Sequence, residues 1–354
     1  MTPTEIRDRI PVAVMGATGS VGQRFVQLLV DHPWFELRAV CASAHKVGRT
    51  YGEAVQWLGA EPLPPEIAEL RLGPVSPPPD AELVFSALPP EVAGPVEVEC
   101  AEAGRLVVSN AASHRMDAGV PLVIPEVNPD HLELLGRRGP GGGGIITNPN
   151  CSTIGLVLAL APIARAYGVK RAHVVTLQAL SGAGLPGVSA MHVIDNVLPF
   201  IRGEEDKLEV ETRKILGRLA DDRLVESDLA VSAQCNRVPV LDGHMLCVSV
   251  ELEREAQADE LVAIWNAFRG EPQERGLPSA PARPTIYLED EDAPQPRLHR
   301  DLERGMATVI GRLRPCSALD WRFVALSHNT LRGAAGGAVL LAELALARGL
   351  LAGV

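Results

Sequence analysis

Apolar and polar positions alternate along the first part of the chain in blocks that predict strands and helices in turn. The apolar run at 10–15 ends at a glycine, and segment 20–33 has its apolar residues on one helical face. Further apolar runs typical of strands lie at 36–43, 81–90, 104–112, 120–127 and 145–148. Strands that alternate with helices indicate a parallel sheet covered on both faces, so we expect a doubly wound α/β domain over 1–150.

The pattern changes after residue 151. The new segments are a strand that ends in a glycine loop (169–184), a charged helix (204–220), two strands around a Pro- and Asp-Gly-containing connection (229–253) and two more strands (307–316 and 320–329). We therefore expect a second α+β domain over 151–329 with an antiparallel sheet. A small-residue helix in 330–354 is expected to return to the first domain. The glycine-rich stretch 136–144 is predicted to be a flexible surface loop.

Composition narrows the class of protein. At 354 residues, with 46% hydrophobic and 22% charged residues, the chain suits an α/β enzyme of about two domains. A net charge of −11 argues against a nucleic-acid partner. The start, MTPTEIRDRIP, lacks the apolar core of a signal peptide, and no apolar run reaches the roughly 20 residues that span a bilayer. We expect a cytoplasmic protein with no membrane partner.

The glycines of GATGSVG stand between the first strand and the first helix. Gly16, Gly19 and Gly22 would let the backbone turn tightly and approach a pyrophosphate, which a helix N-terminus stabilises. The spacing is G-x-x-G-x-x-G rather than G-x-G-x-x-G, and a strand-to-helix turn without a ligand has the same pattern. Its place near the N-terminus, before a second strand, favours a Rossmann-like nucleotide-binding domain.

The residues after the second predicted strand bear on the choice of cofactor. NAD-selective domains usually carry a carboxylate at this strand end, where it binds the ribose hydroxyls. Here the strand ends at Ser43, followed by Lys46 and Arg49, and no carboxylate occurs before Glu53. A hydroxyl and two cations suit a 2′-phosphate, so we expect NADP(H), with Lys46 the stronger ligand. A solvated basic loop is the alternative interpretation.

Six cysteines occur without a CxxC pair, so neither a metal site nor a disulfide framework is expected. Cys151 differs from the other five because NPNCSTIG places it where a strand ends and a helix begins. Free N–H groups and the helix dipole at such a position favour the thiolate and could stabilise an oxyanion. On position alone, an inert buried thiol and a catalytic nucleophile both stay open.

A nucleophile needs a partner for proton transfer. His244, in NRVPVLDGHM, follows Arg237 by seven residues, so the two side chains could face one pocket from adjoining strand ends. Arg237 carries the fork-shaped donor that suits a carboxylate. A lone histidine is more often structural, and the residues by themselves leave that alternative open.

Several motifs together resemble the aspartate-semialdehyde dehydrogenase family, in its archaeal and fungal branch. They are GATGSVGQRF, SNAASHRMDAGVPLVIPEVN, NPNCSTIG, LQALSGAGLPG, GEEDKLEVETRKIL, NRVPVLDGHM and SHNTLRGAAGGAVLLAE. The match runs from about residue 10 to 350 in the same order, which is more specific than any single motif. It implies NADPH-dependent reduction of aspartyl phosphate through a cysteine thioester. It also implies a homodimer or homotetramer in which the second domain supplies the dimer sheet.

The resemblance also implies a role for each matching residue. Cys151 would be the nucleophile, His244 the general acid/base, and Gln178 would orient the acyl group. Arg237 would bind the substrate α-carboxylate and Glu204 its amino group. The phosphate would be held by Lys207, Arg115 and Asn150, and the nicotinamide would meet Ser181, Gly182 and Asn329. The other cofactor contacts would be Gly16, Thr18, Gly19, Ser20, Val21, Ser43 and Lys46.

Three other functions compete with this one. Malonyl-CoA reductase shares the branch's framework and cysteine chemistry. N-acetyl-glutamyl-phosphate reductase is a further relative, but its nucleophile motif is usually Gly-Cys-Tyr rather than Asn-Cys-Ser. A dinucleotide-sensing regulator built on an inactive dehydrogenase would be the non-enzymatic alternative, and retention of the four residue types Cys, Gln, Arg and His argues against it.

Overall fold

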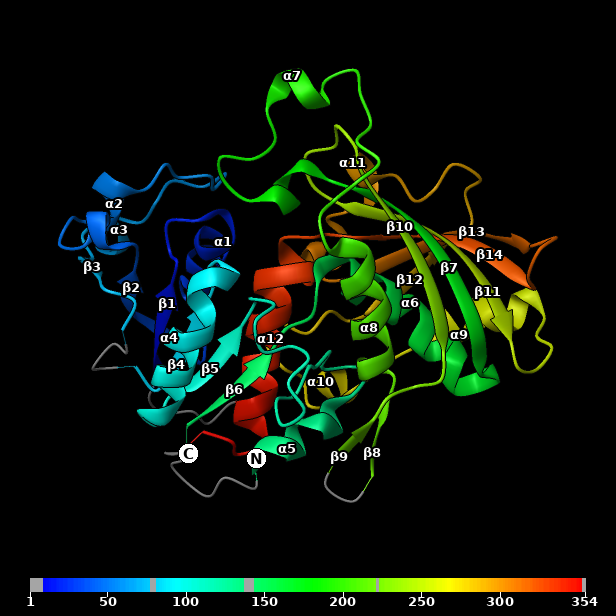
Figure 1. Cartoon of the computed structure of the whole chain (residues 1–354), viewed down its shortest axis with the longest axis horizontal. Helices are drawn as coiled ribbons and strands as arrows, with labels where there is room; N and C mark the ends of the chain where they lie inside the picture. Colours follow the sequence, from blue (N-terminus) through cyan, green and yellow to red (C-terminus); the bar gives the residue numbers. More distant parts are fainter. Residues whose placement is uncertain (1–8, 77–80, 137–142, 221–222, 352–354) are drawn as a thin grey trace.

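The computed structural model describes residues 9–76, 81–136, 143–220 and 223–351, and these contain two six-stranded sheets (Figure 1). The first sheet is parallel throughout, in the order β3-β2-β1-β4-β5-β6. Its strands are β1 (Ile10–Met15), β2 (Phe35–Cys41), β3 (Leu72–Gly73), β4 (Leu83–Ser86), β5 (Leu106–Ser109) and β6 (Gly144–Thr147). This order confirms the predicted doubly wound fold.

Helices cover both faces of this sheet, which explains why its strands are continuous apolar runs. Val12 and Val14 point into a core that includes residues of α1 and α12. Ala13 and Met15 point to the opposite face, where α4 packs. The three helices are α1 (Ser20–Leu29), α4 (Pro90–Glu102) and α12 (Gly336–Ala347).

The second sheet has the order β10-β7-β11-β14-β13-β12. Its strands are β7 (Val169–Gln178), β10 (Ala230–Arg237), β11 (His244–Leu252), β12 (Thr285–Leu288), β13 (Thr308–Pro315) and β14 (Trp321–Ser327). Leu156 and Leu160 of α6, Leu208 of α8 and Trp265 of α9 share one core with this sheet. These helices are α6 (Cys151–Tyr167), α8 (Glu204–Ile215) and α9 (Ala258–Ala267).

The prediction of an antiparallel second sheet is wrong. The sheet is mixed rather than antiparallel, because β10 pairs with β7, and β12 with β13, in parallel. β10 and β11 are consecutive in sequence, yet β7 lies between them and pairs with both. Strand neighbours are chosen by side-chain packing across the sheet, and a short connection alone does not determine them.

The predicted strand at 120–127 is also wrong. This buried segment makes only one isolated bridge, between Leu122 and Thr147. Pro121 and Pro125 have no N–H to donate, so a continuous ladder cannot form. The charged helix α8 ends at Ile215, short of the predicted residue 220. Most of the predicted loop 136–144 lies outside the described residues.

The remaining elements are short. The helices are α2 (Tyr51–Ala54), α3 (Pro65–Ala68), α5 (Glu133–Gly136), α7 (Ala190–Val193), α10 (Glu271–Glu274) and α11 (Pro296–His299). The 3₁₀ turns are η1 (Ala44–Lys46), η2 (Pro129–Leu132), η3 (Leu180–Ala183) and η4 (Leu302–Gly305), and η5 (Leu331–Ala335) is a π-helical turn. A small hairpin pairs β8 (Arg218–Ala220) with β9 (Arg223–Val225). In the part of the chain described, no helix combines the length and apolarity required to cross a membrane.

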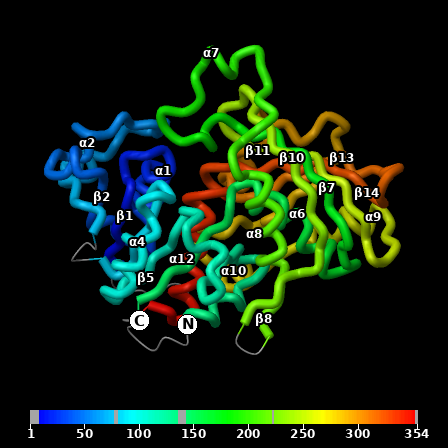
Figure 2. Tube along the Cα trace, viewed as in Figure 1, coloured from blue at the N-terminus to red at the C-terminus, as the bar shows by residue number. Residues whose placement is uncertain are grey.

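The C-terminal helix returns to the first sheet, as the sequence predicted. Figure 2 shows α12, in red, beside the N-terminal strands, and its residues belong to the core that contains β1 and β4. Its one carboxylate, Glu343, is fully buried and lies 2.9 Å from His32 Nε2. The chain thus crosses between the two sheets twice, once at α6 and once before α12.

Candidate active site

The ends of three strands bring the predicted catalytic residues to one edge of the second sheet. Gln178 ends β7 and Arg237 ends β10, and the two residues are register partners. β11 runs antiparallel to β7, so His244 at its start lies at the same edge. Cys151 begins α6, which follows the last strand of the first sheet. The site therefore lies where the two halves of the chain meet.

The nucleophile helix begins at Cys151, as the sequence predicted. Asn150 is its N-cap, and its side-chain oxygen accepts hydrogen bonds from the N–H groups of Ser152 (2.9 Å) and Thr153 (3.3 Å). Gly333 of η5 packs directly against the nucleophile, because a Cβ at Gly333 would lie 2.7 Å from Cys151 Cβ. Only glycine fits beside the thiol at this point.

The surroundings of Cys151 oppose its predicted ionisation in the substrate-free site. Burial raises the pKa of its thiol to about 12, and the Glu204 carboxylate adds to the rise. Arg115, Arg237 and a helix N–H group lower this pKa by less than burial and Glu204 raise it. A helix N-terminus favours a thiolate only when desolvation and nearby anions do not outweigh it. These surroundings favour the protonated thiol before substrate binds.

His244 is buried and uncharged. Burial lowers its pKa to about 3, and the positive charges of Arg237 and His328 lower it further. Its Nδ1 accepts a hydrogen bond from the Ala179 N–H at 3.0 Å, so the neutral ring carries its hydrogen on Nε2. Nε2 makes no hydrogen bond to any described residue. This atom is the free proton donor of the site.

Glu204 connects several of the predicted site residues. Its Oε2 accepts hydrogen bonds from Asn150 Nδ2 at 2.8 Å and Gln178 Nε2 at 3.4 Å. Its Oε1 pairs with Lys207 Nζ at 3.1 Å. The carboxylate thus joins three separate stretches of the sequence into one polar cluster near Cys151.

Arg237 is held on the other side of the cluster. Its Nη1 donates to the Ala179 carbonyl at 2.6 Å, and burial lowers its pKa. Gly182 packs closely over it, since a Cβ there would lie 3.0 Å from Arg237 Nη1 and 3.1 Å from His244 Nε2. Any side chain at this position would displace the guanidinium or the imidazole.

Arg115 reaches the site through a residue that the sequence analysis missed. Its Nη1 pairs with Glu211 Oε1 at 2.9 Å, and Glu211 Oε2 accepts the backbone N–H of Asn150 at 2.6 Å. Glu211 lies seven residues after Glu204, two helical turns along the same face of α8. This seven-residue spacing is the feature of the sequence that could have indicated Glu211 as a site residue.

The predicted cofactor residues form a second group at the start of α1. Gly16 has φ +74°, and a Cβ there would lie 2.6 Å from the Ala87 carbonyl oxygen. The helix is capped by Gly19 without a side-chain bond, which leaves its first N–H groups free. Thr18, Ser20 and Val21 flank this cap. Lys46 Nζ donates to Thr18 Oγ1 at 3.0 Å, and Ser43 is exposed beside it.

Asn329 links the cofactor group to the catalytic group. Its Nδ2 donates to Ser181 Oγ at 2.7 Å, and its Oδ1 accepts the N–H of Gly243 at 2.8 Å, next to His244. The glycine loop also approaches α1, because a Cβ at Gly184 would lie 4.0 Å from Ser20 Oγ. The structure therefore brings both sets of predicted residues to neighbouring positions.

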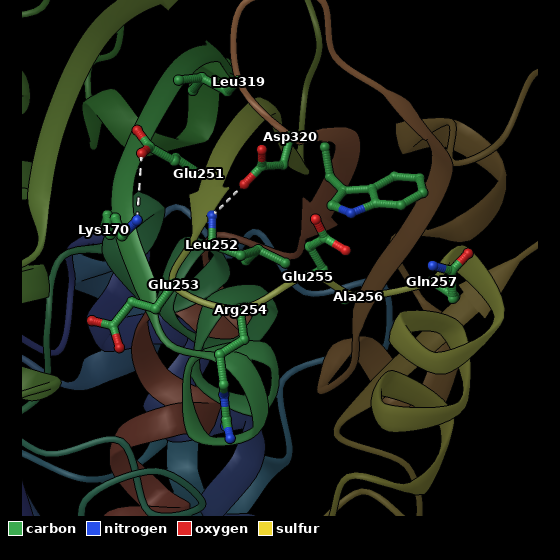
Figure 3. Close-up of a pocket in the computed structure, with 11 residues that line it drawn as sticks. Lys170, Glu251, Leu252, Glu253, Arg254, Glu255, Ala256, Gln257, Leu319 and Asp320 are labelled. Carbon is green, nitrogen blue, oxygen red and sulfur yellow. Dashed lines mark hydrogen bonds and ion pairs between the residues drawn. The ribbon is translucent and has the colours of Figure 1, made fainter.

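A polar groove elsewhere on the second sheet is not part of this site. It measures about 490 Å³ and lies at the opposite ends of β7 and β11, as Figure 3 shows. Lys170 pairs there with Glu251, and Asp320 accepts the N–H of Leu252. These polar groups are paired with one another, and none of the predicted site residues lines the groove. Within the described ranges, no group of three His, Cys, Asp or Glu side chains could hold a metal ion.

Comparison with known proteins identifies the family of this chain. The family model "Semialdehyde dehydrogenase, NAD binding domain" matches residues 11–135, and "Semialdehyde dehydrogenase, dimerisation domain" matches 160–332. The aspartate-semialdehyde dehydrogenase of Archaeoglobus fulgidus is 46% identical over 95% of this chain and 98% of its own. The chain belongs to the aspartate-semialdehyde dehydrogenase family.

Other aspartate-semialdehyde dehydrogenases extend the likeness to fungi and to solved structures. The Schizosaccharomyces pombe protein is 43% identical over 96% of this chain and 99% of its own. The crystal structure of the Candida albicans enzyme with NADP superposes with a TM-score of 0.90, at 40% identity. That superposition covers 97% of this chain and 100% of the other. Both halves of the present fold therefore have counterparts in the family.

The ionisation state of Cys151 predicts its reactivity without substrate. Its alkylation rate should rise about tenfold per pH unit from pH 7 to 10, because only the thiolate reacts and its pKa is about 12. Glu204→Gln should increase the rate severalfold at pH 8, since one anion beside the thiol is removed. Glu209→Gln, on the same helix, is the matched control. Labelling is followed by mass spectrometry of the Cys151 peptide, and a rate that levels off below pH 9 would contradict the assignment.

Proposed function

We propose that this chain catalyses the NADPH-dependent reductive dephosphorylation of L-aspartyl 4-phosphate to L-aspartate 4-semialdehyde. The reaction belongs to the biosynthesis of the aspartate family of amino acids. The convergence of Cys151, His244, Gln178, Arg237 and Glu204 from separate segments is the observation that carries the proposal. The relatives named aspartate-semialdehyde dehydrogenase support it.

The charged residues account for recognition of the substrate. The Arg237 fork suits the α-carboxylate, and Glu204 supplies the anion for the α-ammonium group. Arg115, Lys207 and Asn150 are the donors for the phosphate. Asn150 Nδ2 and Lys207 are bonded to Glu204 in the free site. Both become available when the substrate ammonium takes over that carboxylate.

The acyl transfer forms a thioester on the protein. The Cys151 sulfur attacks the carbonyl carbon, the carbonyl becomes an oxyanion, and its collapse breaks the bond to the phosphate oxygen. The thiol proton leaves with the phosphate. Gln178 orients the acyl group, and the Nε2–H of His244 donates to the developing oxyanion.

The second half of the reaction reduces the thioester. The dinucleotide, when bound, supplies hydride to the acyl carbon. The oxyanion that results collapses to the aldehyde, and Cys151 leaves as a thiolate. A proton from solvent then restores the neutral thiol, while the Nε2–H of His244 donates a hydrogen bond to the leaving sulfur. Because burial keeps His244 uncharged, it retains its own Nε2 hydrogen at neutral pH and acts as a hydrogen-bond donor in both halves of the reaction.

The structure has features that suit NADP(H). The uncapped N-terminus of α1 offers free N–H groups to a pyrophosphate, and Gly16 allows close approach of the backbone. Lys46, held beside Thr18, places a cation next to this turn for a 2′-phosphate. Ser181, Gly182 and Asn329 are the residues closest to the nicotinamide in this proposal.

The competing functions fit the site less well. Malonyl-CoA has no ammonium group, so it would leave Glu204 without the partner that its position beside Gln178 and Asn150 offers. A regulator without activity has no use for Cys151 at a helix N-terminus or for an unpaired His244 Nε2. The aspartyl substrate uses all of these groups.

We also propose that the chain acts as a homodimer or homotetramer. A segment between η3 and α8, which carries α7 and projects at the top of Figure 1, exposes Met191 (90%), Ile194 (69%) and Phe200 (67%). Apolar side chains this exposed are typical of contact surfaces.

Light scattering should give a mass near two or four times 37.7 kDa; a monomer at tens of micromolar would contradict this. A cytoplasmic location stays a prediction of the sequence.

The catalytic assignment predicts an activity that requires NADP, aspartate semialdehyde and phosphate together, and that also requires the Cys151 thiol. The wild-type protein should reduce NADP when given aspartate semialdehyde and inorganic phosphate together, and not when either is left out. Cys151→Ala should lower kcat by about a thousandfold or more, because no covalent intermediate can form. Cys316→Ala, at a cysteine outside the site, is the control and should retain activity. Substantial turnover by Cys151→Ala would exclude the thioester route.

The cofactor assignment predicts a selective change at Lys46. Lys46→Ala should raise the KM for NADP about tenfold, the effect of losing one charge-assisted hydrogen bond, and leave the KM for NAD within about twofold. Arg49→Ala is the matched cation, since its guanidinium donates to the Glu53 carbonyl instead of Thr18. Steady-state kinetics with both cofactors measures the effect. An equal rise with NADP and NAD would refute the 2′-phosphate contact.

A further inference from the structure

Helix α8 carries two buried charges beyond its substrate-binding start. Glu211 and Lys214 are almost inaccessible to solvent, although both residue types are rarely buried. They are three residues apart, so both lie on one face of the helix. Neither matched a predicted role, and both contact the segment around Arg115.

Glu211 binds two donors that belong to different parts of the site. One oxygen pairs with the Arg115 guanidinium at 2.9 Å, and the other accepts the N–H of Asn150 at 2.6 Å. Asn150 caps the helix on which Cys151 is the first residue. One carboxylate therefore connects a phosphate-binding cation to the nucleophile helix.

The other contacts of Arg115 leave N–H donors free for a ligand, including the one on Nε. Its Nη2 donates to the Asn110 carbonyl at 2.7 Å, and its Nε makes no hydrogen bond to any described residue. Because the side chain is buried, an unsatisfied N–H costs free energy until a ligand accepts it. A phosphate oxygen is the acceptor that the proposed reaction supplies.

Lys214 fixes the backbone of the same segment. Its Nζ donates to the carbonyls of Arg115 (2.6 Å), Asp117 (2.9 Å) and Val120 (3.0 Å). These three bonds use all three donors of the ammonium group. Burial lowers the pKa of Lys214 to about 8. The loop that carries Arg115 is thus held to α8 through both its backbone and its side chain.

We propose that Glu211 is a positioning residue for the phosphate-handling half of the reaction. It sets the place of the Arg115 guanidinium relative to the N-terminus of the nucleophile helix, so that the phosphate is held at a constant distance from Cys151. The inference rests on the proposed function, in which Arg115 binds the phosphate. A carboxylate is required because two donors converge on it; an amide has one acceptor oxygen and would turn its NH₂ toward the other donor.

The test compares two substrates of one assay. In phosphate-dependent oxidation of aspartate semialdehyde, Glu211→Gln should raise the KM for phosphate about tenfold or more, which corresponds to loss of one charge-assisted hydrogen bond. The KM for aspartate semialdehyde should stay within about threefold, because Arg237 and Glu204 bind that molecule. Glu209→Gln is the matched control on the same helix. Its carboxylate accepts one N–H, from Ala233, and an amide oxygen can replace it.

A double variant tests whether Glu211 acts through Arg115. Arg115→Ala should raise the KM for phosphate strongly, and adding Glu211→Gln should raise it no further, because the two residues form one unit. Additive effects would overturn the proposal. So would an equal rise in both KM values accompanied by a lower melting temperature, which indicates a general structural role.

Two further measurements distinguish failure of this proposal from failure to fold and from failure of the proposed function. If Glu211→Gln does not fold, Glu211→Asp makes the same test, since the shorter side chain retains the charge but cannot reach both donors. Its KM for phosphate should lie between those of the wild type and Arg115→Ala, and a wild-type value would overturn the proposal. A wild-type enzyme without any phosphate-dependent turnover would instead contradict the proposed function.

Discussion

Asn150 is held by two carboxylates of one helix, and the site is organised around that constraint. Glu204 accepts its side-chain NH₂, and Glu211 accepts its backbone N–H two turns further along α8. The Asn150 oxygen meanwhile caps α6. The position of Cys151 is thus determined by side chains from another helix as well as by its own. Asn150 and Glu211 are buried, so losing one partner would leave another buried group unsatisfied, which makes the arrangement rigid.

The site avoids burying a charged nucleophile and a charged acid together. Burial raises the pKa of Cys151 and lowers that of His244, so both are neutral before substrate arrives. Desolvation disfavours the charged form of either group, and this explains the two opposite shifts. The charged side chains around them are compensated: Glu204 pairs with Lys207, Arg115 pairs with Glu211, and Arg237 donates to a carbonyl group.

The C-terminal segment joins the two halves of the molecule. Asn329 ties the glycine loop to the start of β11, and Gly333 packs on Cys151. Arg332 pairs with Glu126 through two buried hydrogen bonds. This pair anchors the π-helical turn η5, which contains Arg332 and Gly333 and leads into α12. π-Helical turns are frequent at functional sites. Helix α12 then completes the core of the first sheet, so the parts that form the site also hold the two sheets together.

Local patterns in the sequence predicted most of the helices and strands and the strand-to-helix turns, whereas the roles of most site residues came from the resemblance to a family. Apolar runs mark strands buried on both faces, and an Asn-Cys junction marks a helix start, because both depend on neighbouring residues alone. Three features could not be predicted from local patterns: the strand order β10-β7-β11, the raised pKa of Cys151 and the two bonds by which Glu211 joins Arg115 to Asn150. Strand order depends on packing between segments far apart in the chain. The pKa of a thiol depends on how deeply it is buried and which charges surround it, and the partners of a carboxylate on a helix face depend on what that face packs against. Only the tertiary structure decides these.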